Sequence, residues 1–568
     1  MADKDAPAAA EEPIESYYDL GHHTRGVTTS SAEAQLWFDR GLNWTFAFGH
    51  EEAVRCFERT LGYDPRCAMA QWGIAYALGP NYNKAWEAFD EVDLVETLGR
   101  TQLVTQQALA LRDEASPVER ALIDALPARY QSAEPPASIE DLNRWNDDYA
   151  DAMRVVYNDY GNDLDIAALF AEALLNRTPW QLWDLASGKP AEAASTPDAI
   201  DVLEKALENP AARVHPLVLH MYIHLMEMSP HPERALRVTD WLRGLVPDAG
   251  HLQHMPTHID VLCGSYSDVV RWNDRAIVAD RKYLKREGPI SFYSLYRAHN
   301  YHFKLYGAMF LGQYETAVEA ADEMIATIPT ELLRVEVPPM ADWLEGFVPM
   351  KMHVLIRFGR WQEIIDTPLP EDQELYCVTT AMIHYAKGVA LAATGRVGEA
   401  EREADLFEAA FKRVPDTRFV FNNRCVDILA IAAEMLSGEL EYRRGDIDAA
   451  FSHLRRSIEL DDGLPYDEPW GWMQPTRHAY GALLLEQGRV EEAEAVYRAD
   501  LGFDGELPRA YQHPNNVWSL HGYHECLVRL GKHELAEVIK PRPDLALART
   551  DVPIHSSCFC RLDHEHEV

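Results

Sequence analysis

The feature that most constrains this chain is one pattern of large, small and helix-ending residues within about 34 positions: Trp37, Gly41, Ala53, Phe57 and Pro65. Gly41 and Ala53 put little side-chain bulk between two helices, so the helices can approach closely. Phe57 is then expected to pack into the next unit, and Pro65 ends the second helix because it has no backbone N–H to donate. The pattern therefore predicts a helix pair that stacks on similar pairs.

The same spacing returns along the chain, most often as a turn glycine followed five residues later by alanine. The units found this way are set by Gly312/Ala317/Pro329, Gly395/Ala400, Gly445/Ala450, Gly488/Ala493/Tyr497 and Gly531/Ala536, and less directly by Ala235/Pro247 and Gly264/Ala276. This spacing resembles the tetratricopeptide repeat (TPR). The resemblance implies an all-α, right-handed superhelical solenoid of TPR-like helix pairs, which also suits 568 residues, too many for one compact core.

The expected organisation has five parts, with an interrupting loop in the third. They are an N-terminal tail (1–25), N-terminal TPR-like helices (26–163), central histidine-rich repeats (164–373) with a loop insertion near 178–210, C-terminal repeats (374–545) and a C-terminal tail (546–568). The start, Met1–Glu12, is acidic and rich in Ala and Pro, without the basic and apolar segments of a secretory signal.

Composition limits the partners of the chain. Lys and Arg number 53 against 91 Asp and Glu, and the resulting net charge of -38 repels nucleic-acid phosphates and anionic membranes. Apolar runs such as Ile428–Ala433 are far shorter than the roughly 18 residues of a membrane span. Eight cysteines are too few for a disulfide framework in a chain of this length, which predicts a cytoplasmic protein. The charge and the short apolar runs predict that it has no nucleic-acid or membrane partners.

The histidines fall at equivalent repeat positions once glycine, alanine and proline have set the register. Position 5 of the first helix carries His220, His254, His302, His478 and His521; position 9 carries His224, His258 and His353; position 2 carries His251 and His299. These positions are three and four residues apart and share one helix face. In TPR arrays this face lines the concave surface, so the rings are expected to meet in one groove.

We predict that these histidines hold a divalent transition metal. Two pairs, His220/His224 and His254/His258, have the i,i+4 spacing that lets one helix give two ligands to one ion. The predicted ligands are His220, His224, His254, His258 and His302, and further candidates are His215, His251, His299, Glu227, Glu172, Asn176, His353, His478, His521, Cys558 and Cys560. Imidazole suits Zn, Cu, Fe and Ni alike. An anion or small-molecule pocket, or packing alone, are the alternatives.

The C-terminal tail adds a C-x-C pair, Cys558 and Cys560, followed by His564 and His566. These residues fit a soft metal or a redox pair, and equally an exposed tail with incidental cysteines.

Several segments resemble a narrower family, namely long TPR-domain proteins from bacteria and fungi with an HMP[ST]HI segment. They are HPLVLHMYIH (215–224), HLQHMPTHI (251–259) and YRAHNYH (296–302), with GIAYALGPNYN and HPNNVWSLHG nearer the two ends. The resemblance covers nearly the whole chain. It implies that the histidines act as a unit and carries no activity over.

The leading functional hypothesis is a metal-dependent enzyme that acts on a small molecule in the concave groove, with an open metal position to polarise it. The sequence contains no P-loop, H-E-x-x-H or G-x-S-x-G motif. Two alternatives stay open: a non-catalytic adaptor that binds a peptide in the groove, and a protein that stores or delivers metal.

Overall fold

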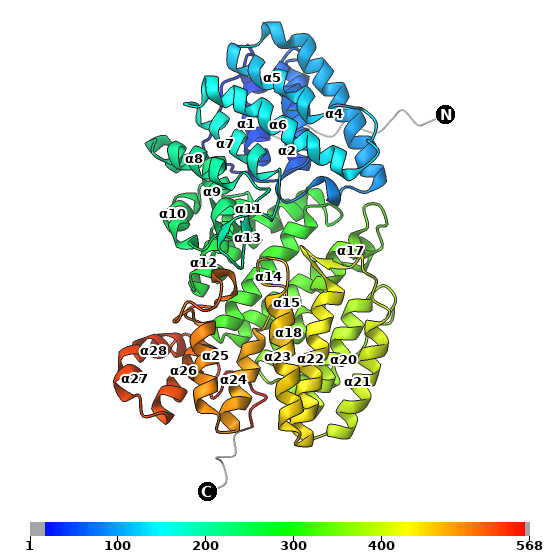
Figure 1. The fold of residues 1–568 in the computed structure, drawn as a ribbon. Helices are drawn as coiled ribbons and strands as arrows, with labels where there is room; N and C mark the ends of the chain where they lie inside the picture. The colour runs from blue at the N-terminus through cyan, green and yellow to red at the C-terminus, as the bar shows by residue number, and fades with distance from the viewer. Residues whose placement is uncertain (1–16, 563–568) are drawn as a thin grey trace.

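The structure is a computed structural model that describes residues 17–562, and helices make up most of it (Figure 1). The first part contains α1 (Ala32–Phe46), α2 (His50–Tyr63), α3 (Ala68–Leu78), α4 (Glu91–Leu111), α5 (Pro117–Arg129), α6 (Ile139–Tyr160) and α7 (Leu164–Leu175). The central part contains α8 (Thr196–Leu207), α9 (Pro216–Glu227), α10 (Leu236–Leu242), α11 (Gly250–His254), α12 (Pro256–Leu262), α13 (Tyr266–Glu287), α14 (Ser294–Leu311), α15 (Tyr314–Ala326), α16 (Thr330–Leu333), α17 (Met340–Leu344), α18 (Met350–Arg357) and α19 (Trp361–Asp366).

The C-terminal part contains α20 (Cys377–Ala393), α21 (Val397–Phe411), α22 (Cys425–Arg444), α23 (Ile447–Asp462), α24 (Thr476–Glu486), α25 (Val490–Asp500), α26 (Val517–Arg529), α27 (His533–Ile539) and α28 (Pro541–Leu547). Two short antiparallel hairpins interrupt the helices: β1 (Trp183–Asp184) with β2 (Lys189–Pro190), and β3 (Phe419–Val420) with β4 (Asn423–Arg424). Helices that follow one another in sequence pack on one another, so the predicted all-α solenoid is confirmed.

The small and aromatic residues of the repeat meet between neighbouring helices, as the sequence predicts. A Cβ atom on Gly41 or Gly73 would lie within 2.7 Å of the Phe57 ring, so this ring is wedged between two helices where only glycine fits. Tyr497 is held between Gly481 and Gly522 in the same way. Each aromatic ring thus locks its own helix pair to the next pair, as Phe57 was expected to do.

The predicted turn glycines end their helices in the left-handed region, where glycine has no Cβ to clash. Their φ values lie between +68° and +88° at Gly264, Gly312, Gly395, Gly445, Gly488 and Gly531. The loop predicted near 178–210 is shorter than expected. It contains β1 and β2, but residues 196–207 form the helix α8. Pro197 is compatible with this helix because it lies in the first turn, where its missing N–H would have no partner within the helix.

The two halves of the chain are joined by more than sequential stacking. The indole of Trp518 on α26 donates to the backbone oxygen of Met309 on α14, at 2.7 Å, and the two helices are in contact (Figure 1). The segment between α23 and α24 reaches back to α9, where the Tyr466 hydroxyl donates to the backbone oxygen of Glu227 at 3.0 Å. In residues 17–562, no helix is long and apolar enough to cross a membrane.

Candidate metal centre

Six buried histidines from four helices of the central part form what we call the histidine cluster. It divides into two triads, each with ring nitrogens within 4.8 Å of one another. The first triad is His220 and His224 of α9 with His251 of α11, and the second is His254 of α11, His258 of α12 and His299 of α14. The triads are adjacent, since the ring centroids of His224 and His258 are 6.1 Å apart, as are those of His251 and His254.

In the first triad, a hydrogen bond to the backbone decides where His220 carries its lone pair. His220 Nδ1 donates to the backbone oxygen of Phe46 at 2.8 Å, and His224 Nδ1 lies 2.9 Å from Glu227 Oε1. A neutral imidazole that donates through Nδ1 has its lone pair on Nε2. The Nε2 atom of His224 is buried without a partner among residues 17–562, and that of His220 lies 3.1 Å from His251 Nε2.

In the second triad, Asn273 fixes the tautomer of His254. The Asn273 amide nitrogen donates to the backbone oxygen of Val269 at 2.8 Å, so its oxygen accepts from His254 Nδ1, also at 2.8 Å. The lone pair of His254 is therefore on Nε2, which lies 2.8 Å from His258 Nε2. A lone pair on His258 Nε2 would repel it at this distance, so this contact needs a proton or a metal ion between the rings.

Two buried glutamates lie outside the rings. Glu227 connects the triads, because its Oε2 is 2.8 Å from His258 Nδ1 while its Oε1 contacts His224. Glu468, from the segment between α23 and α24, forms an ion pair with the same nitrogen of His258. Carboxylates on the far nitrogen are typical of metal-binding histidines, since they fix the ring and raise its basicity.

Burial sets the charge of the cluster. Desolvation, followed by the effect of neighbouring rings, holds the pKa well below its usual value at His220, His224, His251, His254 and His299. These rings are therefore neutral, which is the form that binds metal. Burial also raises the pKa of Glu227 to about 8 and that of Glu468 well above its usual range. Burial thus favours the neutral form of both carboxyl groups, and a divalent ion beside them would favour the ionised form.

The groove expected from the sequence is not open at this point, because aromatic side chains cover the rings. Phe48, Trp180 and Phe421 adopt φ values of 56°, 59° and 46°, a region that is strained for bulky residues. Their ring centroids lie 4.6, 5.9 and 4.4 Å from those of His220, His224 and His299, respectively. Such strain persists only where surrounding structure enforces it, and it is concentrated at functional sites.

The structure brings together four of the five predicted ligands, His220, His224, His254 and His258. His302 lies to one side, with its Nε2 2.9 Å from the sulfur of Met473 and its ring centroid 6.4 Å from that of His299. The candidates His251, His299 and Glu227 lie in or against the cluster. The sequence placed His302 at the position that His299, one turn earlier on α14, holds in the structure.

The other candidates lie elsewhere. His353 packs on Trp472, His478 lies between Arg357 and Asp500, and His521 lies on α26. These histidines share repeat positions with the cluster but belong to units further along the solenoid, so their rings do not converge with it. Glu172 accepts from the Tyr76 hydroxyl, and Asn176 contacts Asn146 through its backbone oxygen.

The C-x-C pair does not join the cluster. Cys558 and Cys560 are bonded to each other as a disulfide and line a small cavity with His478. Their sulfurs are thus neither thiolates nor near the triads. His564 and His566 lie outside the described residues.

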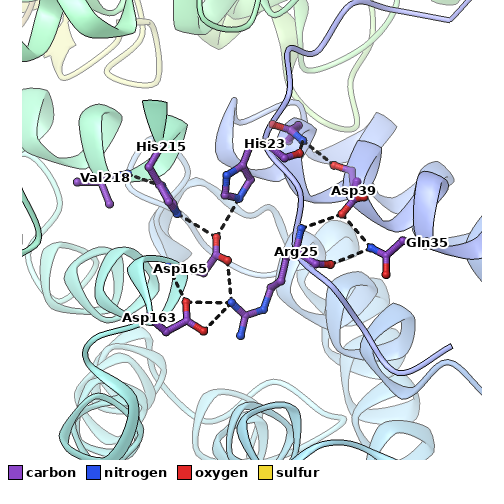
Figure 2. A network of polar contacts seen from close by, with 9 residues as sticks. His23, Arg25, Gln35, Asp39, Asp163, Asp165, His215 and Val218 are labelled. Carbon is purple, nitrogen blue, oxygen red and sulfur yellow. Dashed lines mark hydrogen bonds and ion pairs between the residues drawn. The ribbon is translucent and has the colours of Figure 1, made fainter. Parts of the chain in front are cut away.

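His215 belongs to a third group, with His23 and Asp165 (Figure 2). Both histidines approach Asp165 Oδ1 through Nε2 at 3.0 Å, and Arg25 donates to Asp165 Oδ2 at 2.7 Å. His215 Nδ1 accepts from the backbone of Val218, so its Nε2 carries the proton and has no lone pair for a metal. Arg25 already supplies the positive charge, and the group fastens the segment before α1 to α7 and α9.

Sequence reasoning missed Glu468, Asn273, Phe48 and Phe421; of the three aromatic covers, only Trp180 was indicated, as a candidate pocket wall beside Pro179. Glu468 and Phe421 lie in connecting segments without repeat spacing, and nothing in the sequence indicates where these segments fold. Asn273 had a signal, because it faces inward on α13 at the spacing of the buried residues Val269, Ala276 and Ile277.

No protein-family model and no curated protein sequence matches this chain. Among solved structures, yeast Tom70 is 12% identical and matches over 91% of this chain and 98% of its own, with a TM-score of 0.30. The Naa15/Naa10 complex bound to HypK-THB is 14% identical and matches over 91% of this chain and 70% of its own, with a TM-score of 0.20.

Proposed function

We propose that the histidine cluster binds two transition-metal ions, one in each triad. The observation that carries the proposal is the fixed tautomer of His220 and His254, which leaves lone pairs on Nε2 atoms that face other ring nitrogens across a few ångströms. Neutral imidazoles with lone pairs directed at a common point are the form in which histidines bind a metal ion.

We further propose that the ions act on a small molecule. Three imidazoles per ion leave a fourth position for water or substrate, which is the arrangement of catalytic zinc sites. The complete burial of the rings favours a small molecule over a peptide, since a peptide adaptor presents its contact residues on an open surface. Storage or delivery of metal would use the same ligands, and the aromatic covers favour it less because they hinder exchange.

Metal analysis of the purified full chain tests the first step. The wild-type chain, loaded with Zn²⁺ and dialysed, should contain two ions per chain. The H220A/H224A and H254A/H258A variants should each lose one ion, because each pair supplies two ligands of one triad. The H220A/H224A variant therefore tests the ion of the first triad, and the H254A/H258A variant tests the ion of the second.

A matched control removes two histidines outside the cluster. His231 and His453 are partly or largely exposed, so the H231A/H453A variant should retain both ions. Glu227→Gln should weaken zinc affinity about 10–100-fold, because Glu227 orients one histidine of each triad. Failure of the wild-type chain to retain zinc, or equal zinc content in all variants, would contradict the proposal.

A further inference from the structure

The Cys558–Cys560 disulfide lies in a C-terminal segment that packs against the C-terminal repeats. Hydrogen bonds hold this segment in place without the disulfide. The backbone oxygen of Ser557 accepts from Arg357 of α18 at 2.8 Å, and Arg443 of α22 donates to the backbone oxygen of Cys560. The bond between the two sulfurs is therefore not what attaches the segment to the helices.

A disulfide between residues two positions apart also has little value as a crosslink. Both sulfurs belong to one segment, so the bond joins no two helices. A disulfide stabilises a fold mainly by restricting the unfolded chain, and this effect becomes smaller as the closed loop becomes shorter. The loop closed here contains one residue, Phe559. The role that remains for the pair is chemical, because the bond can be reduced and formed again.

The two cysteines differ in exposure. Cys560 is 3% exposed, whereas Cys558 is partly exposed. Both line a cavity of about 40 Å³ between α18, α20, α22 and α24, which has room for a few water molecules or the end of a small thiol. A thiolate that arrives from solvent therefore meets Cys558 first, and Cys560 is the sulfur that leaves. The small cavity favours a low-molecular-weight thiol over a protein dithiol.

The other six cysteines of the chain, all within residues 17–562, are free thiols in surroundings that suppress their reactivity. Five of them are buried, and Cys263 is partly exposed. Desolvation raises the pKa of all six, for example to about 11 at Cys263 and to about 12 at Cys526. Such thiols stay protonated near pH 7 and are poor nucleophiles. Disulfide exchange is therefore expected at the Cys558–Cys560 pair alone.

We propose that Cys558 and Cys560 form a thiol–disulfide exchange site whose reductant is a low-molecular-weight thiol. The thiolate of this thiol attacks Cys558 Sγ, the S–S bond breaks, and Cys560 leaves as a thiolate that takes a proton from water. A second thiolate then attacks the sulfur of the bound thiol. This step releases a small disulfide and leaves Cys558 as a thiol.

The reaction balances without a metal ion. Two small thiols and the protein disulfide give one small disulfide and the protein dithiol, so the small thiols are oxidised and the cysteine pair is reduced. In the reverse direction, the protein dithiol reduces a small disulfide. The site is thus independent of the histidine cluster and of the function proposed for it.

The first test uses glutathione as the probe and the full chain, kept metal-free with EDTA. The native protein is oxidised with glutathione disulfide, then treated with glutathione, alkylated with iodoacetamide and analysed by peptide mass spectrometry. Cys558 and Cys560 should be alkylated only after the glutathione step, and the five buried cysteines should stay unmodified. Free thiols at the pair after oxidation, or reduction of the pair only in denaturant, would overturn the proposal.

Serine variants test the order of the two sulfurs. Cys560→Ser should trap glutathione on Cys558 as a mixed disulfide, because no second thiol is left to release it. Cys558→Ser should form its adduct about tenfold more slowly or not at all, since Cys560 is buried. Cys263→Ser, which removes the partly exposed cysteine outside the pair, should leave reduction of the pair unchanged. Equal adduct formation in the first two variants would overturn the assignment of Cys558 as the attacked sulfur.

A turnover assay tests the activity itself. The wild-type chain should accelerate the reduction of 2-hydroxyethyl disulfide by glutathione at least about tenfold relative to the C558S/C560S variant. The C263S variant should match the wild type. Equal rates with the wild-type chain and the C558S/C560S variant would overturn the proposal.

Discussion

The histidine cluster and the C-terminal repeats α20–α25 are both built from paired helices, but the side chains buried between the helices differ in polarity. In the repeats, the buried faces carry mainly Ala, Leu and aromatic residues, and the helices have 11 to 20 residues. In the cluster the inner face carries imidazoles, and the helical path breaks at Pro256 into α11 and α12, of 5 and 7 residues. The same scaffold can therefore be optimised for packing in one place and give up regularity for polar chemistry in another.

The largest change in stability is expected from a substitution in the regular C-terminal repeats. Tyr497→Ala should lower the local free energy of unfolding of the C-terminal repeats by about 3–5 kcal/mol, because the ring fills the space between Gly481 and Gly522. Hydrogen exchange of amides in α24–α26 measures it. Tyr497→Phe, which loses only the hydroxyl contact with Ser557, should cost about 1 kcal/mol. Zinc content should be unchanged in both; a loss of zinc would show that the two regions are coupled.

A smaller effect is expected from zinc, which should stabilise the helices of the histidine cluster and not the C-terminal repeats. Zn²⁺ at 100 times its dissociation constant should add about 2.7 kcal/mol to the stability of the helices that hold the ligands. Hydrogen exchange of α9 to α12, with and without zinc, measures the gain. The H254A/H258A variant should lose the part due to the second triad. Equal protection of α20–α25 by zinc would contradict a local site.

Acidification should destabilise the region around His353 and His478. Burial lowers the pKa of His353 to about 3 and that of His478 to about 4, below the roughly 6.5 of an unfolded histidine. The unfolded chain therefore takes up protons first, and stability present above pH 6.5 is lost as the pH falls toward 4. The loss should be roughly 2 kcal/mol per histidine between pH 7 and pH 5.

Urea titrations at the two pH values measure this loss. His353→Gln should reduce the pH dependence by about the contribution of one histidine, since glutamine does not titrate. His231→Ala, at an exposed position, should leave it unchanged. A pH dependence that His353→Gln does not alter would contradict the buried neutral state of this ring.

The smallest effect concerns a helix start on the regular side. Asp446 accepts from the backbone N–H of Ala449 as the N-cap of α23, so Asp446→Ala should cost about 1 kcal/mol. Asp446→Asn retains an acceptor and serves as the control. Thermal unfolding compares the two variants. An equal loss in both would assign the effect to charge at the helix N-terminus instead of the cap.

The repeat spacing predicted the scaffold because each residue in it has one local task. Gly41 and Phe57 meet within one unit, and turn glycines such as Gly312 need only their own helix. The pairs His220/His224 and His254/His258 were also found from sequence, since their spacing acts within one turn of helix. Local periodicity therefore predicted both the fold and the two histidine pairs.

What the spacing could not predict depends on the path of the whole chain. Equivalence in the repeat does not mean proximity, because each unit lies further along the solenoid; His478 shares a repeat position with His254 and lies beside Asp500. Glu468 and Phe421 meet the cluster through segments without periodicity. The burial that closes the expected groove results from such segments, and no local pattern reports it.

The distance in sequence between Phe48 and Glu468, which both meet the histidine cluster, has a consequence for biosynthesis. A ribosome must make more than four-fifths of the 568 residues before the last of these contacts can form. Helices near the start can stack while the chain is still growing, but the surroundings of the histidine cluster are complete only after Glu468 has emerged. Under the proposed function, loading with metal would then be a late event, and a nascent chain would offer imidazoles to the cell's metal pool before their final enclosure exists.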